Sequence, residues 1–564
     1  NSSHGSGQKE QIRECKMLAG FEPEKIQNLE GARIAIRSLL NVVEEMQAEN
    51  QRLRKEVGEL RDEINRLKGE QGRPEIKPDK PKREKSDHSS EKERRRPQSW
   101  QKKSKNDKIQ IDRIERLSVD TSELPADARP NGYEKSIVQD LCIRTDNVLF
   151  IKDEYYSPSQ GTTYLAPMPA GYQGQFGPSI RSLVITLYYA GGMTEPKILE
   201  FLTQFGISIS TGQISNLLVK EQNAWHAEKE TIWRAGLRSS DWQHMDDTAT
   251  RVNGENQHCH VLCNPYYTAY FTRPSKDRLT LIHLLQGTKE LQLLLNPESL
   301  EWFDLLRTPQ WAQKKLAKLC DQPITLAELK NWIERELAHR LNDQQQARIL
   351  EAAALTAYYA QTQTPLIPIL LTDDAPQFRY LTRLQALCWI HEGRHYKKLS
   401  PFVAHHQRLL ADFQKKFWIF YHQLNDFREA PDPATAVSLR QRFQELFTTV
   451  TGYDQLDQCI AKTLAKQARL LLVLDYPHLP LHNNPAELGV RQRVRKRDIS
   501  FGPRSLDGVA AWDTFMTLVE TAKKLGVSFY AYVFDRLSQS FRLPSLAQLI
   551  PPLSYNSSQD PIPI

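Results

Sequence analysis

The chain has 564 residues, of which 40% are hydrophobic and 25% charged, and its formal net charge at pH 7 is +7. This composition is typical of a soluble globular protein of several domains and excludes a wholly disordered chain. No run of about 18 apolar residues and no secretory signal are visible, which argues against a membrane-spanning or secreted protein. The seven cysteines are scattered and include no Cys-x-x-Cys pair, so neither a zinc ribbon nor a disulfide framework is predicted.

The first predicted element is a long helix within 21–68, after a stretch at 1–20 that we interpret as a tag remnant or disordered start. Apolar residues recur there with spacings that alternate between three and four: Ile36, Leu39, Val43, Met46, Leu53, Val57, Leu60, Ile64 and Leu67. Branched residues at the a positions and mostly leucines at d, such as Leu53 and Leu60, favour a parallel two-stranded coiled coil. Asn50 at an a position would pair with its twin and fix the register. The alternative is an amphipathic helix packed on the body of the protein.

A basic segment follows, and we interpret residues 69–112 as a flexible linker. Residues 71–110 contain 14 Lys and Arg against 7 Asp and Glu, so their excess of positive charge equals the net charge of the whole chain. Such a segment, which includes Arg94, Arg95 and Arg96, suits a polyanion such as nucleic acid. A solvated linker that its charge keeps soluble is the alternative.

Residues 113–235 are predicted to form a small mixed region. Globular structure is expected to start near Ile114, with short strand-like runs between 148 and 169. Residues 194–222 resemble a helix-turn-helix, in which Gly206 allows the tight turn. Such a pair can place its second helix in a DNA major groove, although helical hairpins are also common in protein cores.

An α/β core is predicted to begin at 236–282. Three strands are expected there: Trp242–Asp247, His258–Asn264 and Thr268–Arg273. A helical insertion is expected at 283–363. Residues 364–379 then contain a short apolar run that is typical of a buried strand, although Pro368 within the run argues against a fully paired central strand.

A second helical insertion is predicted at 380–478. The second part of the core follows at 479–540, with one helix starting near Asn483 and another near Val509. Residues 541–564 are rich in Pro and Ser, which indicates a loose tail.

Three acidic positions are candidates for metal-dependent chemistry: Asp246 or Asp247, Asp373 or Asp374, and Glu487. An acid within a strand that also carries Trp and Met needs a reason, because a buried charge is costly unless it is paired or bound to metal. Carboxylates on neighbouring strands can hold two divalent ions for in-line phosphoryl displacement. Oxygen ligands favour Mg²⁺ or Mn²⁺ over zinc.

Strand geometry selects one acid from each adjacent pair. Successive side chains of a strand point to opposite faces, so one member of each pair can enter a shared site. Asp246 shares its face with His244, and Asp373 shares its face with Leu371 and lies nearest the end of its strand. We therefore choose Asp246 and Asp373.

Glu487 has two interpretations. If Asn484 is the N-cap and Pro485 the first helical residue, Glu487 occupies the third position, where a capping-box acid belongs. An acid at a helix start can also face a metal ion. A basic run follows and is interpreted as a phosphate track or as intrahelical ion pairs: Arg491, Arg493, Arg495, Lys496 and Arg497.

Several passages resemble the transposases of the insertion sequence 66 family. They are residues 244–248, the strand and acid around Asp373, Cys388–His391 with Arg394, residues 481–487, Phe501-Gly502, residues 518–527 and residues 530–532. The resemblance covers most of the chain. One departure is that residues 114–170 contain a single cysteine, Cys142, where the family often has a cysteine-rich module.

The resemblance implies an α/β fold with an RNase H-like core that helical insertions interrupt and a coiled coil precedes. It implies that Asp246, Asp373 and Glu487 bind two Mg²⁺ or Mn²⁺ ions. The implied activity is cleavage of the ends of an insertion sequence and joining of the 3′-hydroxyl ends to target DNA. DNA and a second copy of the chain are the implied partners, with helper proteins left open, and the implied location is the cytoplasm of a prokaryote, at the nucleoid.

Cys388 and His391 match a Cys-x-x-His element that the resemblance places near the site. We interpret them, with Arg394, as structural support. No zinc is expected, because two ligands alone do not close a zinc site.

Other functions stay open at the level of sequence. One is a transposase-derived protein that binds DNA without cutting it. A coiled-coil adaptor without a DNA role and a nuclease without strand transfer are the others.

Overall fold

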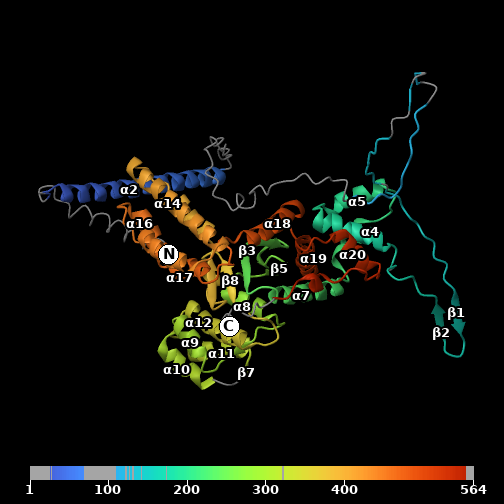
Figure 1. Cartoon of the computed structure of the whole chain (residues 1–564). Helices are drawn as coiled ribbons and strands as arrows, with labels where there is room; N and C mark the ends of the chain where they lie inside the picture. Colours follow the sequence, from blue (N-terminus) through green and yellow to red (C-terminus); the bar gives the residue numbers. More distant parts are fainter. Residues whose placement is uncertain are drawn as a thin grey trace.

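In the computed structural model, the described residues are 26, 28–68, 109–120, 124–125, 128–129, 133–141, 143–172, 174–319 and 323–553. The predicted DNA contacts Arg94, Arg95 and Arg96 lie outside them. A central sheet lies between two groups of helices, and the long helix α2 (Leu29–Leu67) lies on the side of the group that contains α14 and α16 (Figure 1). Within the described part of the chain, no helix is both long and apolar enough to cross a membrane.

The sheet has five strands: β3 (Trp242–Val252), β4 (Glu255–Cys263), β5 (Thr268–Arg273), β8 (Ile369–Thr372) and β9 (Leu384–Leu387). Their order is β5-β4-β3-β8-β9. The first three strands pair antiparallel, whereas β8 is parallel to both of its neighbours. The three strands predicted for the first core segment are confirmed.

Two details of the sheet differ from the prediction. Strand β8 begins after Pro368 and is paired on both sides, with β3 and β9, because the proline falls just outside the hydrogen-bonded ladder. Strand β9 lies within the segment 380–478 that was predicted to be helical, so that prediction is wrong there. A strand of four residues such as Leu384–Leu387 is too short for periodicity alone to distinguish it from part of a buried helix.

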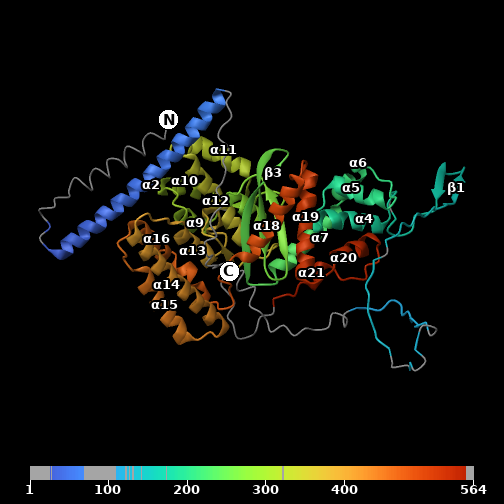
Figure 2. The same ribbon diagram turned by 90° about the horizontal axis from the view of Figure 1, so that it is seen from above.

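Helices cover both faces of the sheet (Figure 2). Helix α18 (Asn484–Ser500) crosses one face at Gly489, where an added Cβ would lie 2.8 Å from Val261 Cγ1. Only glycine permits so close an approach of helix and strand. On the other face, Met245 and Phe271 pack in a large core with α7 (Asn223–Leu237) and α8 (Arg278–Gln286).

Helix α19 (Leu506–Lys524) covers the outer edge of strand β5. The backbone N–H groups of Thr268, Tyr270 and Thr272 bond to side-chain oxygens of Thr521, Thr517 and Asp513, respectively. Two residues of a strand span about 6.8 Å and four residues of a helix span about 6 Å. The bonding residues of β5 and α19 therefore stay aligned over three pairs. The edge is therefore closed to another strand.

The helices on the β5 side form a lobe that contains the predicted helix-turn-helix. They are α4 (Pro178–Ile185), the π-helical turn η4 (Thr186–Ala190), α5 (Glu195–Gln204), α6 (Thr211–Val219), α20 (Phe529–Leu537) and α21 (Leu546–Leu549). Gly206 has φ +75° between α5 and α6, and Ser210 forms a capping box. The predicted helical hairpin is thus confirmed, and its contact with DNA stays a prediction.

Two helical insertions extend the other side of the sheet. The first contains α9 (Ser299–Leu305), α10 (Gln310–Leu316), η5 (Ala317–Leu319), α11 (Leu326–Glu336) and α12 (Asp343–Ala360), with short strands β6 (Leu293–Leu294) and β7 (Pro323–Ile324). Its apolar side chains continue the large core beneath the sheet. The turn η6 (Pro376–Phe378) follows β8.

The second insertion has an aromatic core of its own. Its elements are α13 (Trp389–Lys398), α14 (Ala404–Glu429), α15 (Pro433–Phe447), α16 (Asp454–Leu464), α17 (Gln467–Leu470) and η7 (Leu472–Leu474). The ring of Trp389 packs against Phe417, Phe420, Phe443 and Phe447. The indole N–H also donates to the carbonyl of Leu470 at 2.9 Å, so the helix after β9 is fixed within this core.

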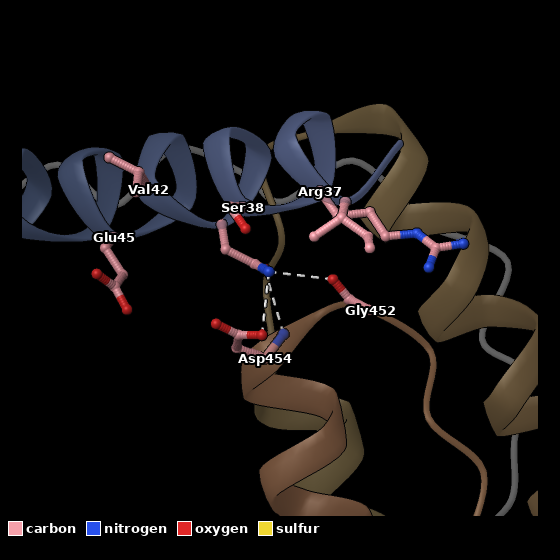
Figure 3. A pocket seen from close by; sticks show the side chains of 8 residues that line it. Arg37, Ser38, Val42, Glu45, Gly452 and Asp454 are labelled. Carbon is pink, nitrogen blue, oxygen red and sulfur yellow. Dashed lines mark hydrogen bonds between the residues drawn. The ribbon is translucent and has the colours of Figure 1, made fainter. Parts of the chain in front are cut away.

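Helix α2 docks on the second insertion through polar side chains. The Glu44 carboxylate accepts bonds from the backbone N–H groups of Phe402 and Val403, at 2.9 and 2.6 Å, just before α14. The Asn41 amide bonds to Gly452 and Asp454 at the start of α16, and Figure 3 shows these bonds beside the pocket between the two elements. Both contacts satisfy N–H groups at helix starts.

The apolar stripe of α2 faces away from this contact. Asn41 and Glu44 occupy heptad positions f and b, whereas all nine apolar a and d residues from Ile36 to Leu67 are exposed in the single chain. Helix α2 therefore docks on the second insertion through one face and leaves its apolar face exposed.

The described residues between 109 and 172 form an extended arm. It contains the hairpin of β1 (Glu154–Ser157) and β2 (Thr162–Leu165), which lies far from the sheet (Figure 1). Apolar side chains of the arm are mostly exposed, and apart from Gly171 burial begins at Pro178. Globular structure thus starts later in the chain than the predicted Ile114.

Candidate active site

The register of the sheet brings two of the predicted acids to one place. His244 of β3 pairs with Leu371 of the parallel strand β8. Asp246 and Asp373 each lie two residues further along the chain, so their side chains point to the same face of the sheet. That face also packs against α18, whose first turn carries Glu487.

The pKa of Asp246 is shifted by its surroundings. The pKa of Asp246 is raised to about 7, first by burial and also by the negative charges of Asp373, Glu487 and Asp247, while the backbone N–H of Asp247 opposes the shift. Carboxylates that share a site resist ionising together unless a cation neutralises them. Carboxylate oxygens are the kind of donor that Mg²⁺ or Mn²⁺ prefers.

The neighbours of the two aspartates point elsewhere and are already bonded. Asp247 Oδ2 accepts a hydrogen bond from Gln377 Nε2 at 2.9 Å. Asp374 forms ion pairs with Arg379, Lys466 and Arg469 at 3.2, 3.3 and 2.9 Å. Burial raises the pKa of Asp374, but the three cations outweigh burial and lower it below its ordinary value. The carboxylates of Asp247 and Asp374 are therefore already engaged by a side-chain donor and by cations, respectively.

Asn483 connects the start of α18 to strand β3, which sequence reasoning missed. Its Nδ2 donates to the carbonyl of Met245 at 2.8 Å, and its Oδ1 lies 2.9 Å from Nδ1 of the buried His244. Its backbone N–H donates to Cys388 Sγ at 3.2 Å. Because these partners are distant in sequence, the Asn-Asn-Pro run was the only signal, and it indicated a helix cap.

The predicted capping role of Glu487 is wrong. The N-cap is Asn483, so Glu487 is the fourth helical residue, one position beyond that of a capping-box acid. Its carboxylate turns instead toward α13. Glu487 Oε2 accepts from Arg394 at 3.1 Å, and Oε1 lies 3.5 Å from His391 Nε2.

Arg394 bridges His391 and Glu487. Its second guanidinium nitrogen donates to His391 Nε2 at 2.8 Å, so this nitrogen is an acceptor and the ring is neutral. Burial and the charge of Arg394 lower the pKa of His391. The guanidinium thus holds the side chain of Glu487 with a charge-assisted hydrogen bond.

Cys388, His391 and Glu487 place three potential metal-binding atoms within 4.8 Å of one another. Burial raises the pKa of the Cys388 thiol to about 12, although backbone N–H groups of Asn483, His391 and Ile390 oppose the shift. A metal ligand would need the thiolate. This environment favours a neutral thiol that accepts N–H groups where β9 ends and α13 begins, which agrees with a supporting role.

Two residues of the predicted phosphate track are buried, so those predictions are wrong. Arg493 is 1% exposed, forms an ion pair with Asp513 at 3.3 Å and donates to Thr272 at 2.9 Å. Lys496 donates to the carbonyl of Tyr188 and lies over the ring of Tyr188, 3.2 Å from its centroid. Burial lowers the pKa of Lys496 to about 7.

The other three basic residues of the track differ in exposure. Arg491 and Arg495 are exposed, and they follow Glu487 at steps of four residues, on nearly the same face of α18. Arg497 is half-buried and donates to the carbonyl of Ala249 at 2.6 Å. Helical periodicity alone does not distinguish the buried basic residues from the exposed ones, because the sequence does not show which face of α18 is buried.

Comparison with known proteins gives two findings. Residues 173–293 and 369–511 match the family model described as Transposase IS66 family. An uncharacterised protein, y4jO, from Sinorhizobium fredii (strain NBRC 101917 / NGR234) is 33% identical over 308 residues, which cover 54% of this chain and 94% of that protein. The chain belongs to the IS66 family of transposases.

The matched segments follow the architecture. They contain the five strands of the sheet and α18, and they leave out residues 294–368. The omitted part corresponds to most of the helical insertion that the sequence predicted at 283–363. Membership of the IS66 family indicates a transposase, and with it an enzyme class that acts on DNA.

Proposed function

We propose that the chain is a metal-dependent transposase in which Asp246, Asp373 and Glu487 form a DDE triad. The observation that carries this proposal is the convergence of three carboxylates from β3, the end of β8 and α18, distant in sequence, on one face of the sheet. Such a cluster stores repulsion that divalent cations relieve. It also has the form of two-metal phosphoryl-transfer sites.

The topology of the sheet supports the proposal that the core is RNase H-like. Three consecutive antiparallel strands are followed by two parallel strands on the far side of the first, with helices on both faces. The acids lie in the central strand β3, just beyond the end of its parallel neighbour β8, and on the helix α18, which packs over β3 and β4. We take this to be the arrangement that the family resemblance implies.

In the proposed mechanism, bound Mg²⁺ or Mn²⁺ would activate the attacking oxygen and stabilise the charge that develops on the phosphate. Asp246 and Asp373 would hold the ions from the sheet, and Glu487 from α18. Asn483 fixes the start of α18 against β3, and Arg394 orients Glu487. Exposed Arg491 and Arg495 would bind phosphates of the DNA backbone next to the cut.

A homodimer is part of the proposal. The open a and d stripe of α2 suits a second copy of the same helix, with Asn50 aligned to its twin. In the single chain, Asn50 Nδ2 bonds back to the carbonyl of Met46 at 3.0 Å. Two protomers would bring two element ends together.

The test is a plasmid assay with the DNA that flanks this gene, the purified protein and Mg²⁺ or Mn²⁺. We expect nicking at the element boundary and joining of a pre-cut 3′-hydroxyl end to target DNA. Asp246→Asn should abolish both reactions. Asp247→Asn is the matched control, because it changes the adjacent carboxylate on the opposite face and should retain activity.

Other outcomes select other functions. Binding without cutting by the unmodified protein would favour the transposase-derived DNA-binding protein. Cutting without joining would favour a nuclease. If Asp247→Asn were inactive and Asp246→Asn active, the assignment of the first acid would be wrong.

A further inference from the structure

Phe501, directly after α18, is an exposed aromatic residue in a strained backbone conformation. It is 87% exposed and has φ +58° and ψ 10°, in the left-handed region. A bulky residue is rare there, and such strain persists only where the surrounding structure imposes it. Glycine is the usual residue at the end of a helix, so the large apolar side chain contributes nothing that the local fold requires.

The backbone on both sides of Phe501 is tightly held. Its own N–H donates to the carbonyl of Arg497 at 2.7 Å. Gly502 has φ +89°, and an added Cβ there would lie 2.6 Å from the carbonyl oxygen of Arg251 in β3. The carbonyl of Pro503 accepts from the N–H of Asn253 at 3.2 Å, in the turn between β3 and β4. The backbone that carries the Phe501 ring is therefore held in place on both sides.

The surroundings of Phe501 include exposed arginine side chains. Arg251 and Arg504 are exposed, and Asp498 is paired with Arg497 at 3.5 Å. Further acids in this region are Asp507 in the first turn of α19, Glu255 opposite Val252 in the β3–β4 hairpin, and Glu195, which interacts electrostatically with Arg504. Toward the candidate active site, Arg491 and Arg495 continue the positive charge along α18.

From these observations we propose that Phe501 is a nucleobase-binding residue, which stacks on an unpaired base of DNA that lies along α18. This inference rests on the proposed function. At about 1.5 Å per helical residue, Phe501 lies roughly 21 Å from Glu487 along the axis. That distance corresponds to roughly six nucleotides of about 3.4 Å each.

An exposed aromatic ring can stack on any of the four bases. Exposed arginines attract the phosphate backbone without reading sequence, and a protruding ring offers a stacking face to a base that has left the duplex. Fully paired DNA offers no such face in its interior. Phe501 should therefore increase affinity for DNA with unpaired bases more than affinity for paired DNA.

The test compares two fluorescent DNA probes by anisotropy: a fully paired duplex and a forked duplex with unpaired bases at one end. The full-length protein should prefer the forked probe, and Phe501→Ala should bind that probe about five- to a hundredfold more weakly, the range of one stacked base. Binding of the paired duplex should change little. The salt dependence of binding should stay the same, because no charge is removed.

Three variants separate stacking from folding. Phe501→Trp should retain the preference for the forked probe. Phe501→Gly removes the ring and relieves the positive φ, so its melting temperature should be equal or higher while its affinity falls. Leu506→Ala, which removes another exposed apolar side chain nearby, should bind both probes as the unmodified protein does.

The outcomes also distinguish the two proposals. If the unmodified protein binds DNA but Phe501→Ala and Phe501→Gly bind both probes equally well, the stacking role is overturned and the proposed function stands. If the unmodified protein binds neither probe, both proposals are overturned.

Discussion

Adjacent acids of the same type have different environments, and strand alternation explains why. Asp246 faces two other carboxylates, whereas Asp247 faces Gln377 on the opposite side of the sheet. Asp373 belongs with the first group, and Asp374 is neutralised by three cations. The identity of a residue therefore says less about its role than the face on which it lies.

The raised pKa of Asp246 predicts a pH dependence of metal binding. Because its pKa in the metal-free folded protein is about 7, well above 3.8, protonation stabilises the fold below 3.8 and this contribution is lost as pH rises through about 7. Metal needs the ionised form. Affinity for Mn²⁺ should therefore fall about tenfold per pH unit below 7 and level off above it.

Calorimetry at about pH 6 and about pH 8, in buffers of different ionisation enthalpy, measures this effect through the protons that Mn²⁺ releases. Asp246→Asn should release none. Asp247→Asn should release as many as the unmodified protein. Equal Mn²⁺ affinity at both pH values would contradict the assignment of the titrating group.

Two arginines of α18 should respond differently to substitution. Arg493→Met leaves the buried Asp513 without its cation, so the free energy of unfolding should fall by about 3–5 kcal/mol. Arg495→Gln changes an exposed side chain and should alter stability by less than about 0.5 kcal/mol. It should instead weaken DNA binding and reduce the slope of log affinity against log salt by about one.

Urea unfolding and salt-dependent anisotropy measure the two effects separately. A stable Arg493→Met protein with weakened DNA binding would restore the original prediction that Arg493 contacts phosphate.

At the scale of elements, the second insertion supports the loop that carries the second acid. Lys466 and Arg469 both contact Asp374, and Lys466 also pairs with the buried Glu392 at 2.7 Å. Arg469 further donates to Gln385 of β9, which in turn donates to Thr372 of β8. The backbone at the end of β8, which carries Asp373 and Asp374, is thus fixed by helices that are distant in sequence.

This connection predicts a positioning effect of Lys466. Lys466→Met keeps the length of the side chain but leaves Glu392 and Asp374 with fewer cations, so the end of β8 should become mobile. We expect the affinity for Mn²⁺ to fall several-fold, with partial recovery in Lys466→Arg. Hydrogen exchange of residues 373–375 should increase, whereas exchange in β4 should not.

The matched control for this prediction is Lys462→Met, in the last turn of α16. Its Mn²⁺ affinity should equal that of the unmodified protein. Unchanged affinity and unchanged exchange in Lys466→Met would show that the insertion does not position the site.

At the scale of the whole molecule, helix α2 is attached to the body and yet leaves its apolar stripe open. A dimer formed through this stripe would hold the two catalytic bodies in a fixed relation, because Asn41 and Glu44 anchor the helix to α16 and α14. The predicted alternatives, a coiled coil and a helix packed on the body, are therefore compatible.

Removal of residues 1–68 tests this arrangement. Light scattering should report a monomer in place of a dimer, metal binding should persist, and pairing of two element ends should be lost. A milder variant, Asn41→Ala with Glu44→Gln, should remain dimeric but loosen α2, seen as faster hydrogen exchange at Phe402 and Val403. A truncated protein that still pairs ends normally would refute the role of the dimer.

The sequence by itself determined the elements with strong local patterns. These elements are the long helix, the strands β3, β4 and β5, and the helices that start near Asn483 and Val509, and they follow from periods of 3.5, 3.6 or 2 residues. The choice of Asp246 and Asp373 rests on the same period of 2 and stays a prediction. The family could also be predicted from short motifs. These features depend on neighbours in sequence or on a repeat that one segment contains.

Only the tertiary structure decided which side chains meet across the chain. It placed β9 within a predicted helical segment, buried Arg493 and Lys496, turned Glu487 from a cap toward Arg394 and gave Asn483 its partners on β3. Each of these outcomes depends on contacts between residues that are tens to hundreds of positions apart. Local periodicity contains no information on such contacts, because packing of whole elements fixes them.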